Sequence, residues 1–189
     1  METLKQMNLP NRLTCLRMVM IIPFVIAMLV GRAQGPWMWT ALILFVGASF
    51  TDMLDGRITR SRHLITDFGK FMDPLADKLL VCSALICLID LNRIPTWVVI
   101  IIIAREFIIS GFRLVASDNG VVIAASWWGK TKTVSQMAMI VLLIINFPSG
   151  PLYGLGQVLI YAACALTVIS LCDYLWKNRQ VLSDRKSVV

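Results

Sequence analysis

The sequence contains few charged residues and only one histidine. Asp, Glu, Lys and Arg make up 15% of the 189 residues, whereas 58% are hydrophobic and the mean hydropathy is +0.75. This composition excludes an ordinary soluble domain and indicates a polytopic membrane protein. The single histidine, His63, stands beside Arg62 in a polar link and is interpreted as a solvated loop residue rather than as a base or a metal ligand.

Cysteines are present but show no spacing that is typical of a metal site. All of them lie in or near apolar segments, and we interpret them as small core residues rather than as disulfides or metal ligands. No internal repeat or low-complexity segment is visible. A cleavable signal peptide is not expected, because the first apolar run is too long and no small-residue cleavage site follows it. The cysteines are Cys15, Cys82, Cys87, Cys164 and Cys172.

Long apolar runs predict an all-α fold with six transmembrane helices. Each run is close to the roughly 20 residues that a bilayer requires. A short amphipathic piece from Glu2 to Leu9 is expected to lie in the membrane interface as an additional helix. Because the connecting loops are short, residues 1–189 are expected to form a single integral-membrane domain. The predicted spans are roughly 11–31, 37–58, 68–91, 94–116, 125–147 and 154–176.

The basic residues predict an orientation. With six spans, sixteen of the 18 Lys and Arg residues fall on the side of both termini, and only Arg32 and Arg93 fall on the other. Because basic residues concentrate on the cytoplasmic side, both termini are expected in the cytoplasm. The net charge of +7 is carried by residues that flank the spans. We therefore expect anionic lipid headgroups and phosphorylated substrates as partners, and not nucleic acid.

Four aspartates occupy the ends of two neighbouring spans. Asp52 and Asp55 are three residues apart and Asp73 and Asp77 are four apart, so each pair shares one helix face. Carboxylates at membrane depth persist when they are paired, metal-bound or exposed to a wet cavity. Two such helices side by side would form a carboxylate cage that suits one or two hard divalent cations such as Mg²⁺ or Mn²⁺. The alternative is a buried salt-bridge network, which would be a costly way to stabilise a bundle, with Arg57, Arg60, Lys70 and Lys78.

A second group of polar residues lies in the fourth and fifth predicted spans. Arg113, Lys130 and Lys132 are interpreted as a pocket for a phosphate group, because Arg supplies a bidentate fork and Lys a point charge. The alternative is anchoring at the headgroups with extended side chains. Arg105 belongs to the pocket or forms a structural ion pair with Glu106.

Further candidates follow from spacing. Thr133 can share a helix face with Lys130. Asn11, Thr14 and Arg17, spaced by three residues, either line the headgroup site or serve as a helix cap and an anchor.

The aspartate spacing resembles a known signature. Asp52-x-x-Asp55-Gly56-x-x-x-Arg60, eight residues, then Gly69-x-x-x-Asp73-x-x-x-Asp77 is similar to the motif of the CDP-alcohol phosphotransferases. The sequence departs from it at Thr59, where the family usually has Ala. The resemblance extends from about Asn8 to the last span. Four segments resemble the branch that uses glycerol 3-phosphate: Asn11-x-x-Thr14-x-x-Arg17, the run from Phe68 to Leu80, Ala104-Arg105-Glu106-Phe107-x-x-x-Gly111-x-Arg113 and Gly129-Lys130-x-Lys132-Thr133.

The resemblance implies a reaction. A phosphatidyl group would pass from CDP-diacylglycerol to sn-glycerol 3-phosphate, with release of CMP. Two Mg²⁺ or Mn²⁺ ions would be held by Asp52, Asp55, Asp73 and Asp77, and Asp77 would also be the general base. CDP-diacylglycerol would contact Asp52, Gly56, Arg60 and Gly69. The acceptor phosphate would be held by Arg113, Lys130 and Lys132.

The distribution of basic residues puts the aspartates, like both termini, on the cytoplasmic side. The resemblance also implies a homodimer in a bacterial inner membrane. Two alternatives stay open. The acceptor could be an inositol phosphate, serine or a second lipid, as in cardiolipin synthesis. The aspartates could instead line the ion path of a metal-ion transporter, although no inverted repeat is evident.

Overall fold

The structure is a computed structural model that describes residues 9–32, 34–62, 67–118, 127–147 and 149–178. For residues 9–14, 52–62, 67–74, 77, 115, 117 and 118 it describes the backbone alone. The predicted interfacial helix at residues 2–9 falls almost entirely outside this range.

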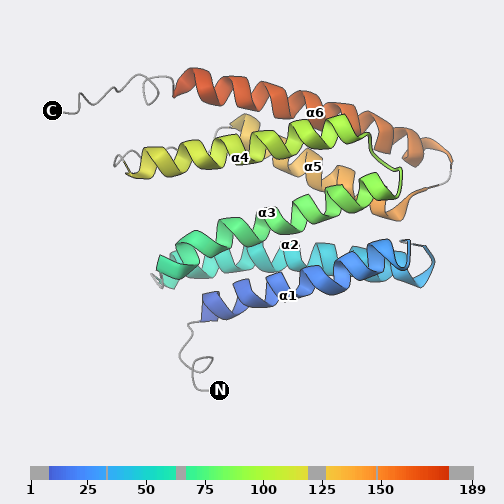
Figure 1. Ribbon diagram of the computed structural model, residues 1–189, viewed down its shortest axis with the longest axis horizontal. Helices are drawn as coiled ribbons and strands as arrows, with labels where there is room; N and C mark the ends of the chain where they lie inside the picture. The colour runs from blue at the N-terminus through green and yellow to red at the C-terminus, as the bar shows by residue number, and fades with distance from the viewer. Residues whose placement is uncertain (1–8, 33, 63–66, 119–126, 148, 179–189) are drawn as a thin grey trace. The chain divides into compact units, whose positions relative to one another are not determined.

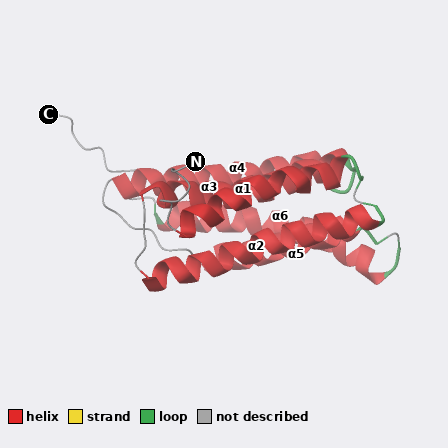
Figure 2. Cartoon of the chain, turned by 90° about the horizontal axis from the view of Figure 1, so that it is seen from below, coloured by secondary structure: helices red, strands yellow, loops and turns green. Residues whose placement is uncertain are grey.

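The described part of the chain is all-helical, as the apolar runs predicted (Figures 1 and 2). Each of the six predicted segments corresponds to one helix, with ends that differ by a few residues. Proline opens two of the helices, α2 and α6, because its fixed φ suits the first helical turn and its missing N–H is not needed there. The helices are α1 (Leu9–Leu29), α2 (Pro36–Arg62), α3 (Asp67–Asp90), α4 (Thr96–Asp118), α5 (Trp127–Ile145) and α6 (Pro151–Lys177).

The chain divides into two compact units. The first contains α1, α2, α3 and residues 143–146, which include the end of α5. The second contains α4, the rest of α5, and α6. The expectation of one domain over residues 1–189 stays a prediction.

In the first unit, α1 packs against both α2 and α3. The rings of Phe24 and Phe45 lie 5.9 Å apart and are fully or almost fully buried. At the turn between α1 and α2, a side chain on Gly31 would overlap the ring of Trp37. Glycine therefore allows the close approach that starts the α1–α2 hairpin.

Arg93 connects three segments at one end of the first unit. Its Nη1 atom donates hydrogen bonds to the carbonyl oxygens of Leu143 (3.0 Å) and Ile144 (2.9 Å), which are at the C-terminus of α5. Its Nη2 atom donates to the carbonyl of Arg32 (3.2 Å), in the loop after α1. A cation at a helix C-terminus satisfies carbonyls that have no partner within the helix. Burial lowers the pKa of the Arg93 guanidinium, which nevertheless stays charged in proteins.

In the second unit, α4 and α6 run parallel. Their ring and polar contacts advance together along both helices: Trp97 with Tyr161, Arg105 with Ser170, and Phe112 with Tyr174. The ring centroids of the two aromatic pairs lie 6.4 Å and 5.7 Å apart.

Within the part of the chain that the structure describes, α6 is long and apolar enough to cross a membrane. Two shorter apolar helical stretches, Cys15–Leu29 and Pro36–Thr51, lie in α1 and α2. The other described helices are interrupted by charged residues, as α4 is by Arg105, Glu106 and Arg113.

Candidate active site

The motif aspartates lie in the helices that the sequence predicted. Asp52 and Asp55 lie in α2, and Asp73 and Asp77 lie in α3. Gly56 and Arg60 are also in α2, and Gly69 is in α3. The side chains of these residues lie outside what the structure describes, and the described side chains contain no group of three or more potential metal ligands. The four-carboxylate cage therefore stays a prediction.

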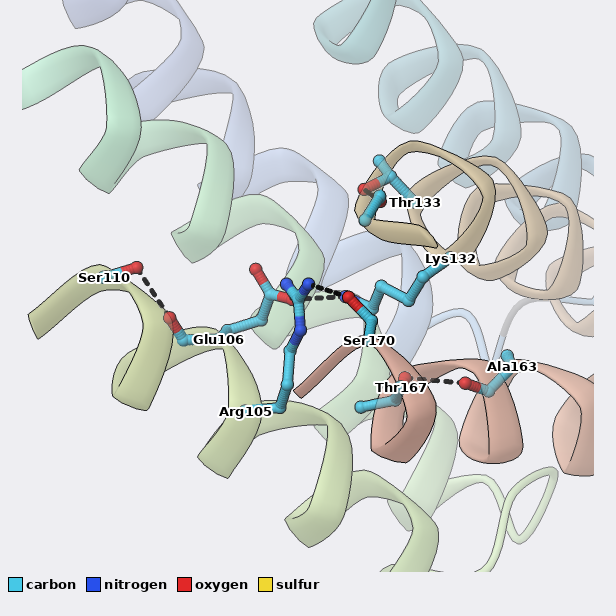
Figure 3. A network of polar contacts seen from close by, with 9 residues as sticks. Arg105, Glu106, Ser110, Lys132, Thr133, Ala163, Thr167 and Ser170 are labelled. Carbon is cyan, nitrogen blue, oxygen red and sulfur yellow. Dashed lines mark hydrogen bonds and ion pairs between the residues drawn. The ribbon is translucent and has the colours of Figure 1, made fainter. Parts of the chain in front are cut away.

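A network of polar contacts joins the three helices of the second unit (Figure 3). The carboxylate atom Oε1 of Glu106 accepts hydrogen bonds from Arg105 Nη1 (3.0 Å) on α4 and from Lys132 Nζ on α5. Arg105 Nη2 donates to the hydroxyl of Ser170 on α6 at 2.6 Å. The hydroxyl of Ser110 donates to the carbonyl of Glu106 at 2.6 Å. The same acidic residue thus connects α5 to α4, and Arg105 connects α4 to α6.

The network is buried and carries an excess of positive charge. Lys132 is 2% exposed, Arg105 8% and Ser170 0%. Two cations share one carboxylate, so the three ionised groups sum to one positive charge. Buried cations need such a partner, because loss of hydration is otherwise uncompensated. Arg105 therefore forms the ion pair that the sequence left as one of two alternatives, and a role for it at the acceptor stays a prediction.

Lys130 and Lys132 do not point the same way. Residues two positions apart on an α-helix point in directions about 200° apart around the helix axis. Lys132 is buried against Glu106, whereas Lys130 is exposed. The sequence placed these two lysines in one pocket with Arg113, and the structure brings Lys132 to α4 without bringing Lys130 there.

Arg113 is exposed and lies seven residues after Glu106, so it occupies nearly the same face of α4 two turns further on. Its guanidinium carbon is 5.8 Å from the ring centroid of Tyr174 on α6, over the ring. This is a cation–π distance. Of the cations that the sequence assigned to the acceptor, Arg113 is therefore the one that α6 holds through an aromatic ring.

The remaining candidate residues lie in α5 and α1. Thr133 is exposed, and its hydroxyl donates to the carbonyl of Gly129 at 3.0 Å. Arg17 is 2% exposed within α1. Asn11 and Thr14 lie in α1 with side chains outside the described part.

Comparison with known proteins shows to which family the chain belongs. The sequence model of the CDP-alcohol phosphatidyltransferases matches residues 7–169. The chain belongs to this family. The match includes all four motif aspartates and extends over both units, so it confirms the resemblance that the aspartate spacing indicated. The CDP-alcohol phosphatidyltransferase region also includes the Arg105–Glu106–Lys132 network.

Curated relatives in the CDP-alcohol phosphatidyltransferase family are similar over most of their length. The CDP-diacylglycerol–glycerol-3-phosphate 3-phosphatidyltransferase of Bacillus subtilis is 42% identical over 187 residues, which cover 93% of this chain and 97% of that protein. A probable phosphatidylglycerophosphate synthase of Mycobacterium tuberculosis is 42% identical over 168 residues, covering 88% of this chain and 79% of that one. The Haemophilus influenzae protein with the same name as the Bacillus enzyme is 37% identical over 182 residues, covering 94% and 96%.

Sequence reasoning missed two residues of α6. Ser170 and Tyr174 are one helical turn apart and meet Arg105 and Arg113 of α4. The available signal was weak: a serine in a mostly apolar helix, followed four residues later by a tyrosine. Their partners are 65 and 61 residues away in the sequence, so local spacing could not pair them.

Proposed function

We propose that this protein transfers the phosphatidyl group of CDP-diacylglycerol to sn-glycerol 3-phosphate, forming phosphatidylglycerophosphate and CMP. The observation that carries the proposal is the 42% identity, over nearly the full length of both chains, to the Bacillus enzyme whose name states these substrates. A hydroxyl oxygen of glycerol 3-phosphate would bond to the phosphorus that carries the diacylglycerol. The bond from that phosphorus to the CMP oxygen would break.

The donor set of the aspartate motif fits hard divalent cations. The helices observed at Asp52–Asp55 and Asp73–Asp77 support a shared face for each pair, and carboxylate oxygens are the ligands that Mg²⁺ and Mn²⁺ prefer. Asp52, Asp55, Asp73 and Asp77 would hold one or two such ions. When bound, these ions would offset the charge of the pyrophosphate and of the departing CMP.

Other proposed roles in the reaction also belong to residues of α2 and α3. Asp77 would take the proton from the acceptor hydroxyl as general base. Arg60 and Asp52 would contact the cytidine diphosphate portion. Gly56 and Gly69, which have no side chain, would let the nucleotide approach the backbones of α2 and α3.

The acceptor phosphate would be held by Arg113, Lys130 and Lys132. Arg113 and Lys130 have exposed side chains, as a group that meets a substrate requires. The Lys132 ammonium is buried and ion-paired with Glu106, so it would contribute to phosphate binding as a fixed positive charge within the second unit.

The proposed setting is a bacterial inner membrane, with six spans, an interfacial segment at residues 2–9, and both termini in the cytoplasm. Support comes from Arg93, which contacts the loop after α1 and the end of α5 from its place between α3 and α4. In a six-span chain these three segments belong to the same membrane side. α4 and α6 run parallel, as the fourth and sixth spans of such a chain would, because successive spans cross the membrane in opposite directions. A homodimer is proposed from the family resemblance.

The test is a transfer assay with purified protein, CDP-diacylglycerol and a panel of acceptors. We expect CMP release that depends on glycerol 3-phosphate and is not supported by serine, glycerol or inositol phosphate. Equal turnover with an unphosphorylated alcohol would overturn the acceptor assignment. Metal flux into protein-containing liposomes without CMP release would instead favour the transporter.

A further inference from the structure

Tyr174 combines deep burial with an unusual set of neighbours near the end of α6. It is 3% exposed, and the edge-to-face ring of Phe112 lies 5.7 Å away at 80°. The guanidinium of Arg113 lies over its ring, 5.8 Å from the centroid. Its hydroxyl has no hydrogen-bond partner within the described part of the chain.

The backbone under Tyr174 is held in place. Its carbonyl oxygen accepts hydrogen bonds from both the backbone N–H (3.2 Å) and the side-chain Nδ2 (2.8 Å) of Asn178, which caps α6. The last turn of α6 therefore presents the ring from a fixed position.

Arg113 differs from Arg105 in the kind of partner that holds it. Arg105 shares the carboxylate of Glu106, which offsets its charge. Arg113 lies over a neutral ring, which attracts a cation without cancelling its charge and without using an acceptor of its own. The guanidinium donors then stay available for a bidentate contact with an oxyanion.

We propose that Tyr174 is a positioning residue for the acceptor: its ring holds the guanidinium of Arg113 in place, still fully charged, to grip the phosphate of glycerol 3-phosphate. This inference rests on the proposed function. An exposed arginine otherwise samples many rotamers and loses that freedom when it binds a ligand. Holding it before the substrate arrives lowers this cost and strengthens acceptor binding.

The experiment compares Tyr174→Phe, Tyr174→Leu and Tyr174→Met in full-length purified protein, with both substrates titrated in detergent micelles. Tyr174→Phe keeps the ring and should leave both KM values within about twofold of wild type. Tyr174→Leu and Tyr174→Met remove the ring, and should raise the KM for glycerol 3-phosphate by roughly three- to tenfold while the KM for CDP-diacylglycerol stays within about twofold. Methionine has a more flexible side chain that can adapt to the vacated space, so it provides a second variant without the ring if the leucine variant is unstable.

Two controls separate positioning from packing. Tyr161→Leu removes the other tyrosine of α6 that contacts an aromatic ring of α4, far from Arg113, and should leave the acceptor KM unchanged. The double variant Arg113→Ala/Tyr174→Leu should have the same acceptor KM as Arg113→Ala alone, because the ring acts through the guanidinium.

The outcomes are distinct. An unchanged acceptor KM in folded Tyr174→Leu or Tyr174→Met, an effect as large in Tyr174→Phe, or additive effects in the double variant would each overturn the inference. If wild-type protein releases CMP without needing glycerol 3-phosphate, the proposed function fails instead, and this is read from the wild-type titration alone.

Discussion

At the scale of single residues, the cations of the second unit differ in their partners. Arg105 and Lys132 are buried and share Glu106, Arg113 is exposed over the ring of Tyr174, and Lys130 is exposed. A cation that is already paired with a carboxylate of the protein attracts a phosphate less strongly. Arg113 and Lys130 are therefore the residues whose removal should affect acceptor binding most directly.

Arg113→Ala and Lys130→Ala should each raise the KM for glycerol 3-phosphate by roughly ten- to hundredfold, since a charge-assisted hydrogen bond contributes about 1.5–3 kcal/mol. The KM for CDP-diacylglycerol should change little. Steady-state titration of each substrate at saturating amounts of the other measures both values. Lys177→Ala, which removes an exposed lysine of α6, is the control. Equal weakening toward both substrates would assign Arg113 and Lys130 a structural role.

Asp77→Asn should reduce kcat by roughly 10²- to 10⁴-fold, because the amide cannot accept the proton of the acceptor hydroxyl. Binding of CDP-diacylglycerol should be affected less, since the proposed base acts on the acceptor. Single-turnover CMP release and equilibrium donor binding separate the two effects. Asp90→Asn, at the other end of the same helix, is the matched control. Near-normal turnover of Asp77→Asn would move the base elsewhere.

At the scale of helices, Glu106 and its neighbour Arg105 connect α4, α5 and α6. Glu106 accepts from α5 through Lys132, and Arg105 reaches α6 through Ser170. Contacts of this kind specify which helix faces meet, although a well-packed apolar replacement can be equally stable.

Glu106→Gln should destabilise the protein by about 3–5 kcal/mol, because it leaves two buried cations close together without the carboxylate that they share. Glu106→Gln/Lys132→Met should recover much of this loss, since it removes one cation with the anion. Unfolding of detergent-solubilised protein, followed by circular dichroism, gives the comparison.

The control for this prediction is Lys177→Ala, which breaks the exposed pair with Asp173 and should cost less than about 1 kcal/mol. If Glu106→Gln proves as stable as Lys177→Ala, the network does not hold the three helices together.

At the scale of the whole molecule, the family match extends from residue 7 to 169 and therefore includes both compact units. The motif aspartates belong to helices of the first unit, and Arg113, Lys130 and Lys132, which we propose hold the acceptor, belong to helices of the second. The proposed metal ligands are all carboxylate oxygens, so we expect the activity to depend on a divalent cation.

Removal of divalent cations should abolish turnover, and Mg²⁺ or Mn²⁺ should restore it. Asp52→Asn, Asp55→Asn and Asp73→Asn should each lose activity by roughly 10²-fold or more, because each removes a charged ligand. The variants should still fold, which circular dichroism and size-exclusion chromatography would verify. Full activity of EDTA-treated protein would contradict the metal mechanism.

The sequence alone determined the helices and the family. Apolar runs of sufficient length specify helices through local spacing, and all six correspond to helices in the structure. The aspartate motif depends on residue identity at fixed intervals, so it identified the family without any knowledge of packing. The carboxylate cage, by contrast, stays a prediction from the same spacing.

Only the tertiary structure decided which polar groups meet. Lys130 and Lys132 read as one basic cluster in the sequence, yet the turn of the helix sends Lys132 to Glu106 and leaves Lys130 exposed. Arg93 reads as an isolated loop cation, yet it caps α5 from a position 50 residues away. Tyr174 reads as an aromatic residue near a helix end, yet it lies under Arg113. Such pairs join residues that are far apart in the chain, and they form only when the helices pack in a particular register.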